Sequence, residues 1–347
     1  MTIEAVAGFA PVSSRARKAA FSWSLIAATL LPVLAVIAYY GNASTYVGMA
    51  LLGAVASTHV IATGYLLTDA DVRSFMTAHP AKMIAVPAAL AAVFGVALSM
   101  PGTMFFVLIV LAVFLYQTWH FGAQNIGVSS FVSFCERGRP LDILEKRAIR
   151  AGIVCGMFGI LYAMPPTFGY TAEQMPVPQW LREILMWAHV LGKIAAALIA
   201  GLALLLAGRS LRKGGPMTAL VLFTSICFFF PMYLSNDFLF AIGMFSTAHG
   251  LQYIVFLGAH SASGSSFNKG MKLGFLVAPM VLAGIMLLAH LFRPSLIAVS
   301  HENLPLLGSI LMGSLTLTHF WVDQHLWRMK ERGAWLKKRY AFIFAKD

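Results

Sequence analysis

The sequence predicts an all-α, polytopic membrane protein of about ten transmembrane helices, with both termini in the cytoplasm. Of its 347 residues, 59% are hydrophobic and 11% are charged, and the mean hydropathy is +0.78. Soluble domains carry about 25% charged residues. The apolar residues also fall into segments that reach the roughly 17–25 residues needed to cross a bilayer. These observations exclude an ordinary soluble domain.

The apolar segments follow one another through most of the chain and are separated by turn-forming residues. The predicted spans are 21–40, 46–67, 84–100, 102–119, 150–166, 184–207, 217–234, 238–258, 271–292 and 304–322. Met100-Pro101-Gly102 divides the third span from the fourth, Pro165-Pro166 ends the fifth, and Gly214-Gly215-Pro216 precedes the seventh. We therefore expect an N-terminal segment (1–20), a single membrane domain (21–326) and a basic C-terminal tail (327–347).

The basic residues alternate between the two ends of these spans. Every Lys and Arg except Arg182, Lys193 and Arg293 lies in the N-terminus, in the tail, or in or directly beside the loops after the second, fourth, sixth and eighth spans. The net charge of +12 is thus spread over short loops. This distribution marks which side of the membrane each loop lies on, and it forms no basic patch that would predict a nucleic-acid partner. By the positive-inside rule both termini are cytoplasmic, in a cell membrane that we expect to be a bacterial inner membrane. The tail, with Trp327, Trp335 and Tyr340, is expected to lie on anionic membrane lipid.

Histidines gather toward the predicted cytoplasmic side. Seven of the ten lie there: His59, His79, His120, His249, His260, His319 and His325. Ionisable residues in apolar spans are costly and usually functional, and imidazole binds iron, copper and zinc. His59, His120, His249 and His319 lie within or at the end of a span, so they are the main candidates for metal ligands. The other three are lesser candidates, because histidines at helix ends also serve as interfacial residues or partners of the helix dipole. For the main four, the alternative is a structural role, in which each histidine forms a hydrogen bond between helices and binds no metal.

Polar side chains lie one helical turn from the candidate ligands. Gln124 follows His120 by four residues, Gln252 and Tyr253 follow His249 by three and four, and Asp323 follows His319 by four. A ligating histidine commonly donates its second nitrogen to an oxygen acceptor, which fixes its tautomer. We therefore expect these four residues to support the ligands or to act directly in catalysis. The three cysteines are far apart and form no CxxC pair, so no thiolate metal site is expected.

The segment His120-Phe121-Gly122 and the gathering of histidines from several helices resemble membrane-embedded non-haem iron oxygenases. The likeness is to the Brp/Blh-type carotenoid dioxygenases and, in general plan, to fatty-acid hydroxylases and desaturases. The HxxxH, HxxHH and HxxxHH boxes of the desaturases are absent. The resemblance implies iron, held mostly by one histidine from each helix.

These features lead to the hypothesis of a metal-dependent oxidoreductase acting on a lipid-soluble substrate, such as an acyl or isoprenoid chain, with an electron donor as partner. Iron is the expected metal, with copper, zinc and haem left open. Three alternatives remain at this level. They are a haem protein that exchanges electrons with quinone, a proton-coupled transporter and a lipid acyltransferase.

Overall fold

A computed structural model describes residues 13–38, 57–66, 69–100, 102–167, 176–234, 238–262, 304–327 and 329–344 of the chain. Every regular element within these ranges is a helix, which confirms the predicted all-α class. The helices are α1 (Ser14–Ala38), α3 (Ser57–Leu66), α4 (Ala70–Ala78), the π-helical turn η2 (Ala81–Ala85), α5 (Val86–Leu98), α6 (Met104–Arg137), α7 (Ile143–Thr167), α8 (Gln179–Arg212), α9 (Pro216–Ile226), α10 (Pro231–Leu234), α11 (Phe238–Ala262), α14 (Leu304–Leu326), α15 (Met329–Arg339) and α16 (Ala341–Phe344).

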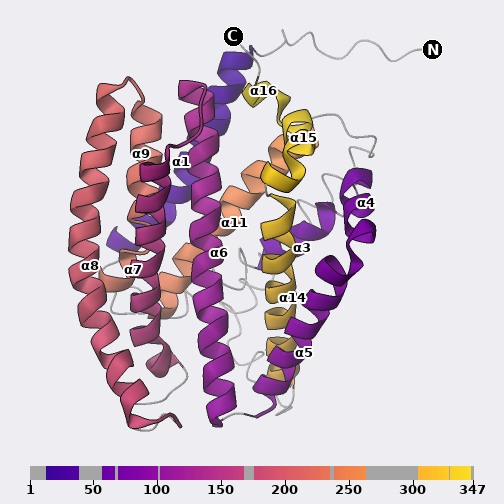
Figure 1. Cartoon of the computed structure of the whole chain (residues 1–347), viewed down its shortest axis with the longest axis vertical. Helices are drawn as coiled ribbons and strands as arrows, with labels where there is room; N and C mark the ends of the chain where they lie inside the picture. Colours follow the sequence, from indigo (N-terminus) through magenta and orange to yellow (C-terminus); the bar gives the residue numbers. More distant parts are fainter. Residues whose placement is uncertain are drawn as a thin grey trace, which may run out of the picture.

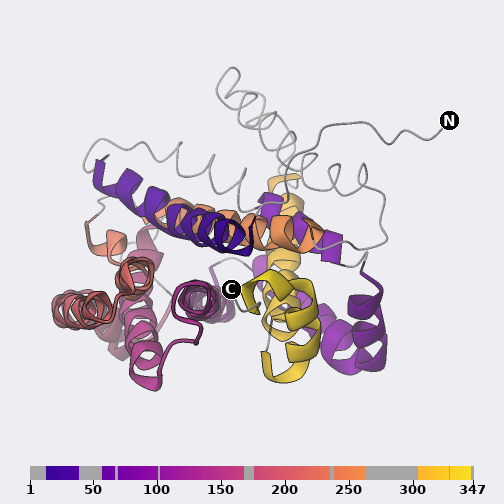
Figure 2. The same ribbon diagram turned by 90° about the horizontal axis from the view of Figure 1, so that it is seen from above.

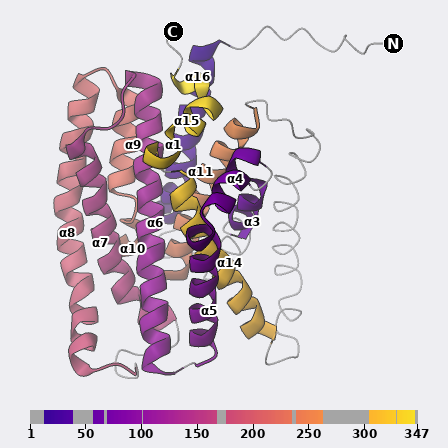
Figure 3. The ribbon, with the colours of Figure 1, turned by 45° about the vertical axis from the view of Figure 1, so that its right-hand side comes forward.

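The long helices stand side by side as a bundle (Figure 1). The start of α1, the connections from α6 to α7 and from α8 to α9, and the short helices α15 and α16 all lie at one end of it. They are among the segments whose basic residues led us to expect them on one side. α4, which carries Arg73 of the loop after the second span, lies further along the bundle. The turn from α5 to α6 lies at the opposite end (Figure 3).

The predicted division of 84–119 into two helices is confirmed. α5 ends at Leu98 and α6 begins at Met104. Gly102 has a φ of 80°, a left-handed conformation that glycine adopts without steric cost. The Thr103 side chain then caps α6 by accepting a hydrogen bond from the Phe106 amide.

Several helices continue well beyond the predicted spans. α6 runs to Arg137 rather than to residue 119, and it ends at Gly138, whose φ is 68°. The polar residues after His120 do not end the helix because they bond to neighbouring helices. For example, the Ser129 and Ser225 hydroxyls lie 2.9 Å apart. His120, predicted at the end of its span, consequently lies near the middle of a 34-residue helix.

Other predicted boundaries also shift. α7 begins at Ile143 rather than at residue 150, and the predicted seventh span is divided into α9 and α10 by a turn at residues 227–230. α14 continues to Leu326, four residues beyond the predicted end of the last span.

Four helices in the described part of the chain are long and apolar enough to cross a membrane. They are Ala81–Leu98, Met104–Arg137, Gln179–Arg212 and Phe240–His260. They match the predicted third, fourth, sixth and eighth spans. The predicted ninth span (271–292) and most of the second (46–67) lie outside the described residues, so the count of ten stays a prediction.

α11 is the most deeply buried of these four helices. α1 runs alongside it, as the view along the bundle shows (Figure 2), and α14 packs against α5 (Figure 3). α11 therefore has helices on several sides, and polar residues along it meet protein rather than lipid.

The C-terminal tail packs back onto the bundle. Trp335 and Tyr340, expected on lipid, are buried, and the Tyr340 hydroxyl donates a hydrogen bond to the Phe256 carbonyl at 3.0 Å. Lys337 and Lys338 are exposed. The amphipathic pattern of the tail was recognised correctly, but its apolar face covers protein rather than bilayer.

Candidate metal centre

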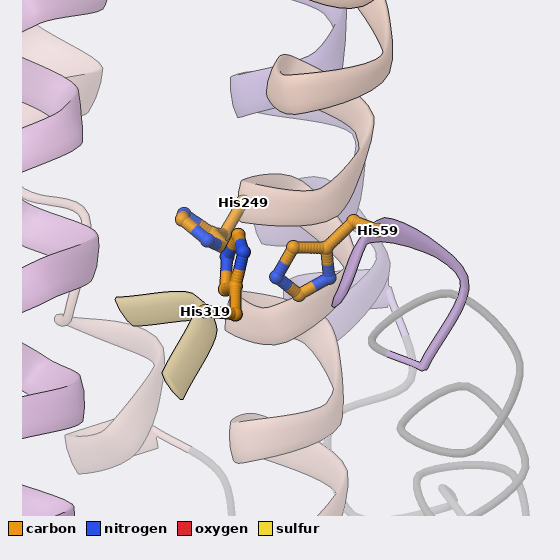
Figure 4. Close-up of side chains that lie close together, drawn as sticks. All are labelled: His59, His249 and His319. Atoms are coloured by element: carbon orange, nitrogen blue, oxygen red, sulfur yellow. The ribbon is translucent and has the colours of Figure 1, made fainter. Parts of the chain in front are cut away.

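Four buried histidines meet in the interior of the bundle. His59 comes from α3, His120 from α6, His249 from α11 and His319 from α14. The ring centroid of His59 lies 4.7 Å from the ring centroids of His249 and His319. The ring centroids of His120 and His249 are 4.8 Å apart. Figure 4 shows His59, His249 and His319 directed toward one another. The structure thus brings together all four main candidates.

The nitrogen atoms of these rings lie at distances suited to sharing a metal ion. His59, His249 and His319 each offer one atom in a group whose members lie within 4.8 Å of one another, and His120, His319 and Asp323 form a second such group. His120 Nε2 lies 3.3 Å from His249 Nε2 and 3.9 Å from Asp323 Oδ2. The two groups share His319 and adjoin one another.

Two of the ring nitrogens have no protein partner. His249 Nδ1 and His319 Nε2 are buried without a hydrogen bond. A buried polar atom that loses its partner in water and gains none in the protein costs about 1–3 kcal/mol. A metal ion bound by these atoms would remove that cost. Imidazole nitrogens with one carboxylate form a donor set that suits iron, copper or zinc, so the residues present fit such an ion.

A chain of amide hydrogen bonds holds α6 against α11 beside the histidines. Gln124 Nε2 donates to the His249 carbonyl at 3.1 Å and to Gln252 Oε1 at 2.9 Å. Gln252 Nε2 in turn donates to Thr29 Oγ1 at 2.8 Å and to Asn125 Oδ1 at 2.9 Å. Gln124 and Gln252, predicted beside different histidines, therefore bond to each other across the helix interface.

A second chain reaches His319. Thr63 Oγ1 is hydrogen-bonded to His319 Nδ1 and lies 3.0 Å from the Tyr253 hydroxyl. Tyr253 lines the same cavity as Asp323, whose Oδ1 accepts a hydrogen bond from Trp327 Nε1. Thr63 was missed by sequence reasoning, although it follows His59 by four residues and so lies on the same helical face. Asn125 and Thr29 were missed as well. Single hydroxyl and amide groups are common in apolar helices, so the sequence does not distinguish these three residues from others of their kind.

A cavity of about 260 Å³ adjoins the centre. His120, Gln124, Tyr253 and Asp323 contribute polar groups to its wall. The remaining lining is mostly apolar and includes Trp119, Val128, Phe131, Phe256 and Trp327. The cavity thus brings an apolar space into contact with His120 and Asp323, two members of the second ligand group.

The three lesser candidates lie apart from both ligand groups found among the described residues. His79 is exposed, and its Nδ1 lies 2.9 Å from the Phe75 carbonyl oxygen. His260 is buried with its Nε2 3.4 Å from Asp69 Oδ2. His325 Nδ1 lies 2.9 Å from the Trp321 carbonyl oxygen. Each has a local structural partner.

Comparison with known proteins identifies no relative. The chain matches no protein-family model, no curated protein and no solved structure.

Proposed function

We propose that this chain is an integral membrane, metal-dependent oxidoreductase of the oxygenase, hydroxylase or desaturase type. The observation that carries the proposal is the meeting of His59, His120, His249 and His319 from four helices, with His249 Nδ1 and His319 Nε2 buried and unbonded. Packing four imidazoles edge to face inside an apolar bundle has no evident benefit for stability. The arrangement is accounted for by a bound cation.

Iron is the metal we propose, and it would supply a redox-active centre able to react with dioxygen. His59, His249 and His319 would hold it, with His120 and Asp323 adjoining on the cavity side. Copper and zinc accept the same ligands. The four buried histidines would form the donor set, in an interior from which bulk water is largely excluded.

The proposed substrate is a hydrophobic small molecule. The cavity meets the centre at His120 and Asp323, and most of its wall is apolar or aromatic. Such a lining binds an acyl or isoprenoid segment through burial of apolar surface. Gln124 and Tyr253, also in the wall, would orient a polar group of the substrate. An electron donor and surrounding membrane lipids complete the proposed partners, and a bacterial inner membrane is the proposed location.

The packing of the rings weighs against the haem alternative. Axial histidines of a haem lie on opposite sides of a wide, flat macrocycle, whereas His59 and His120 both lie edge to face against His249 with centroids 4.7 and 4.8 Å apart.

Metal analysis of the detergent-purified protein tests the proposal. We expect a stoichiometric transition metal, retained in His79→Ala and lost in His59→Ala and His249→Ala. His79 is the matched control because its ring lies outside the cluster. A protein that purifies without metal and binds none when incubated with Fe²⁺, Cu²⁺ or Zn²⁺ would overturn the proposal. A Soret band would establish the haem alternative instead.

A further inference from the structure

The hydroxyl of Thr63 joins three helices at the edge of the histidine cluster. It is carried by α3, bonds to His319 Nδ1 on α14, and lies 3.0 Å from the Tyr253 hydroxyl on α11. Thr63 is 8% exposed and Tyr253 is 1% exposed, so water does not compete for these contacts. The Thr63 hydroxyl also lies 3.4 Å from the His59 carbonyl oxygen, which can accept its proton.

The hydroxyl proton of Thr63 has acceptors other than His319. Thr63 Oγ1 donates to the His59 carbonyl oxygen, one turn back in α3, at 3.4 Å, and the Tyr253 oxygen lies 3.0 Å away. A hydroxyl has one proton to donate and lone pairs that accept. With that proton directed to His59 or Tyr253, Thr63 accepts from His319 Nδ1, which places the His319 proton on Nδ1.

The other nitrogen of His319 leads to the same tautomer. Nε2 is buried and has no hydrogen-bond partner. A proton there would be an unsatisfied buried donor, whereas a bare lone pair is free to bind a metal ion. Both ends of the ring thus favour Nδ1–H and a free Nε2.

We infer that Thr63 is a positioning residue of the metal centre, which holds His319 in the Nδ1–H tautomer so that Nε2 is its ligand atom. Through its contact with the Tyr253 hydroxyl it also links this ligand to the cavity, which Tyr253 lines. The inference rests on the proposed metal-binding function and deepens it by assigning the ligand atom and a residue that selects it. A change at the cavity wall would thereby reach His319 through hydrogen bonds alone.

Metal affinity of matched variants provides the first test. Thr63→Val removes the hydroxyl at nearly constant volume, Thr63→Ser keeps it, and Thr224→Val removes a buried hydroxyl that bonds only within α9. Loss of an outer partner of a ligating histidine typically lowers metal affinity about 10–100-fold. We expect that loss for Cu²⁺ in Thr63→Val, and affinities close to the unaltered chain in the other two.

Pulsed EPR of the Cu²⁺-loaded protein adds a readout that general destabilisation does not move. The method detects the remote nitrogen of each ligating imidazole, and that signal depends on the hydrogen bond at the remote nitrogen. Compared with the unaltered chain, one remote-nitrogen signal should change in Thr63→Val. All of these signals should be unchanged in Thr63→Ser and Thr224→Val. Tyr253→Phe should shift the same signal by less, because Thr63 keeps its bond to His319 and loses only the next acceptor.

The tautomer itself is measurable in the unaltered, metal-free protein, so the inference does not depend on a variant that folds. ¹⁵N NMR of histidine-labelled protein distinguishes Nδ1–H from Nε2–H, and the His319 signal is the one absent in His319→Gln. Nδ1–H is expected. An Nε2–H tautomer, or unchanged Cu²⁺ affinity and EPR signal in Thr63→Val, would overturn the inference while leaving the metal centre intact. Failure of the unaltered chain to bind metal would overturn the proposed function instead.

Discussion

The imidazole of His249 is fully buried, and its Nδ1 has no hydrogen-bond partner within the described structure. Its Nε2 faces His120 Nε2 at 3.3 Å, and its ring packs on Phe121 with centroids 4.4 Å apart. His260, on the same helix, has a carboxylate partner in Asp69. These two buried histidines, eleven positions apart on one helix, therefore differ: His260 has a carboxylate partner, whereas His249 Nδ1 has none. Of the two, His249 is the one suited to binding a ligand.

This contrast predicts a separation of stability from metal binding. His249→Leu should abolish metal binding and leave the metal-free protein at least as stable as the unaltered one. Burying a nitrogen without a hydrogen-bond partner costs about 1–3 kcal/mol, and the substitution removes that cost. His260→Leu should lower stability, because it leaves Asp69 with one partner fewer. Thermal unfolding of both metal-free variants in detergent measures this. A His249→Leu variant that unfolds well below His260→Leu would contradict the interpretation.

Close approach of helices depends on particular glycines. A Cβ at Gly152 in α7 would collide with the Ile226 carbonyl at the end of α9, while one at Gly201 in α8 would meet no atom within 4 Å. The backbone carbonyl cannot rotate away as a flexible side chain does. The contact between α7 and α9 therefore requires glycine at position 152. At position 201 of α8 there is room for a larger side chain.

We expect Gly152→Ala to destabilise the protein by about 1–3 kcal/mol, the usual range for overpacking. Gly201→Ala should be neutral or stabilise by up to about 1 kcal/mol, because alanine favours the helix. Circular dichroism during heating in detergent compares the two. Equal unfolding midpoints would show that α7 and α9 do not approach as closely as described.

The tail helix α15 is attached to the bundle by a buried ion pair. Arg339 Nη2 lies 2.6 Å from Asp69 Oδ2, with Asp69 buried and Arg339 nearly so. The neighbouring pair of Lys338 with Asp71, at 3.8 Å, is exposed. The two pairs join the same helices but differ in their access to water.

Arg339→Met should therefore cost about 3 kcal/mol, since removing one member of a buried pair leaves an uncompensated charge. Lys338→Met should cost at most about 1 kcal/mol, as for other exposed pairs. Limited proteolysis of the tail, together with thermal unfolding, reports both effects. Similar behaviour of the two variants would argue against a buried attachment.

At the scale of the whole molecule, the start of α1, the connections from α6 to α7 and from α8 to α9, and the helices α15 and α16 share one end of the bundle (Figure 1). Reporter fusions after Arg139, after Gly214 and after Phe344 should therefore all report the cytoplasm. A fusion after Ser99, in the turn between α5 and α6, should report the opposite side. The same sidedness for Ser99 and Arg139 would refute a crossing by α6 and the predicted topology with it.

Metal should also act on the whole fold, because its proposed ligands come from four helices. Binding to the folded state alone stabilises by about 2.7 kcal/mol at a metal concentration 100 times Kd. Addition of Fe²⁺ or Zn²⁺ should raise the unfolding midpoint of the unaltered chain, and chelator should reverse the rise. His249→Leu serves as the control and should show no response to either.

The all-helical class, the break before α6, four apolar helices and the four converging histidines were all accessible from the sequence. They rest on local properties: hydropathy over a helix length, turn-forming residues and the cost of an imidazole in an apolar segment. The predicted end of α6 came too early and the predicted start of α7 too late, because the polar and basic stretch between the two spans was expected to be a loop. Whether a polar side chain ends a helix or bonds across an interface depends on its neighbours in space.

Only the tertiary structure decided which polar groups serve the histidines. Gln124 and Gln252 follow different histidines in sequence, yet they bond to each other, and Thr63 reaches a histidine that lies 256 positions away. The aromatic face of the tail likewise found protein instead of lipid. Sequence spacing determines which side chains share a helical face. Which helices those faces meet is fixed by packing between distant segments, and the hydrogen bonds around His319 follow from that packing.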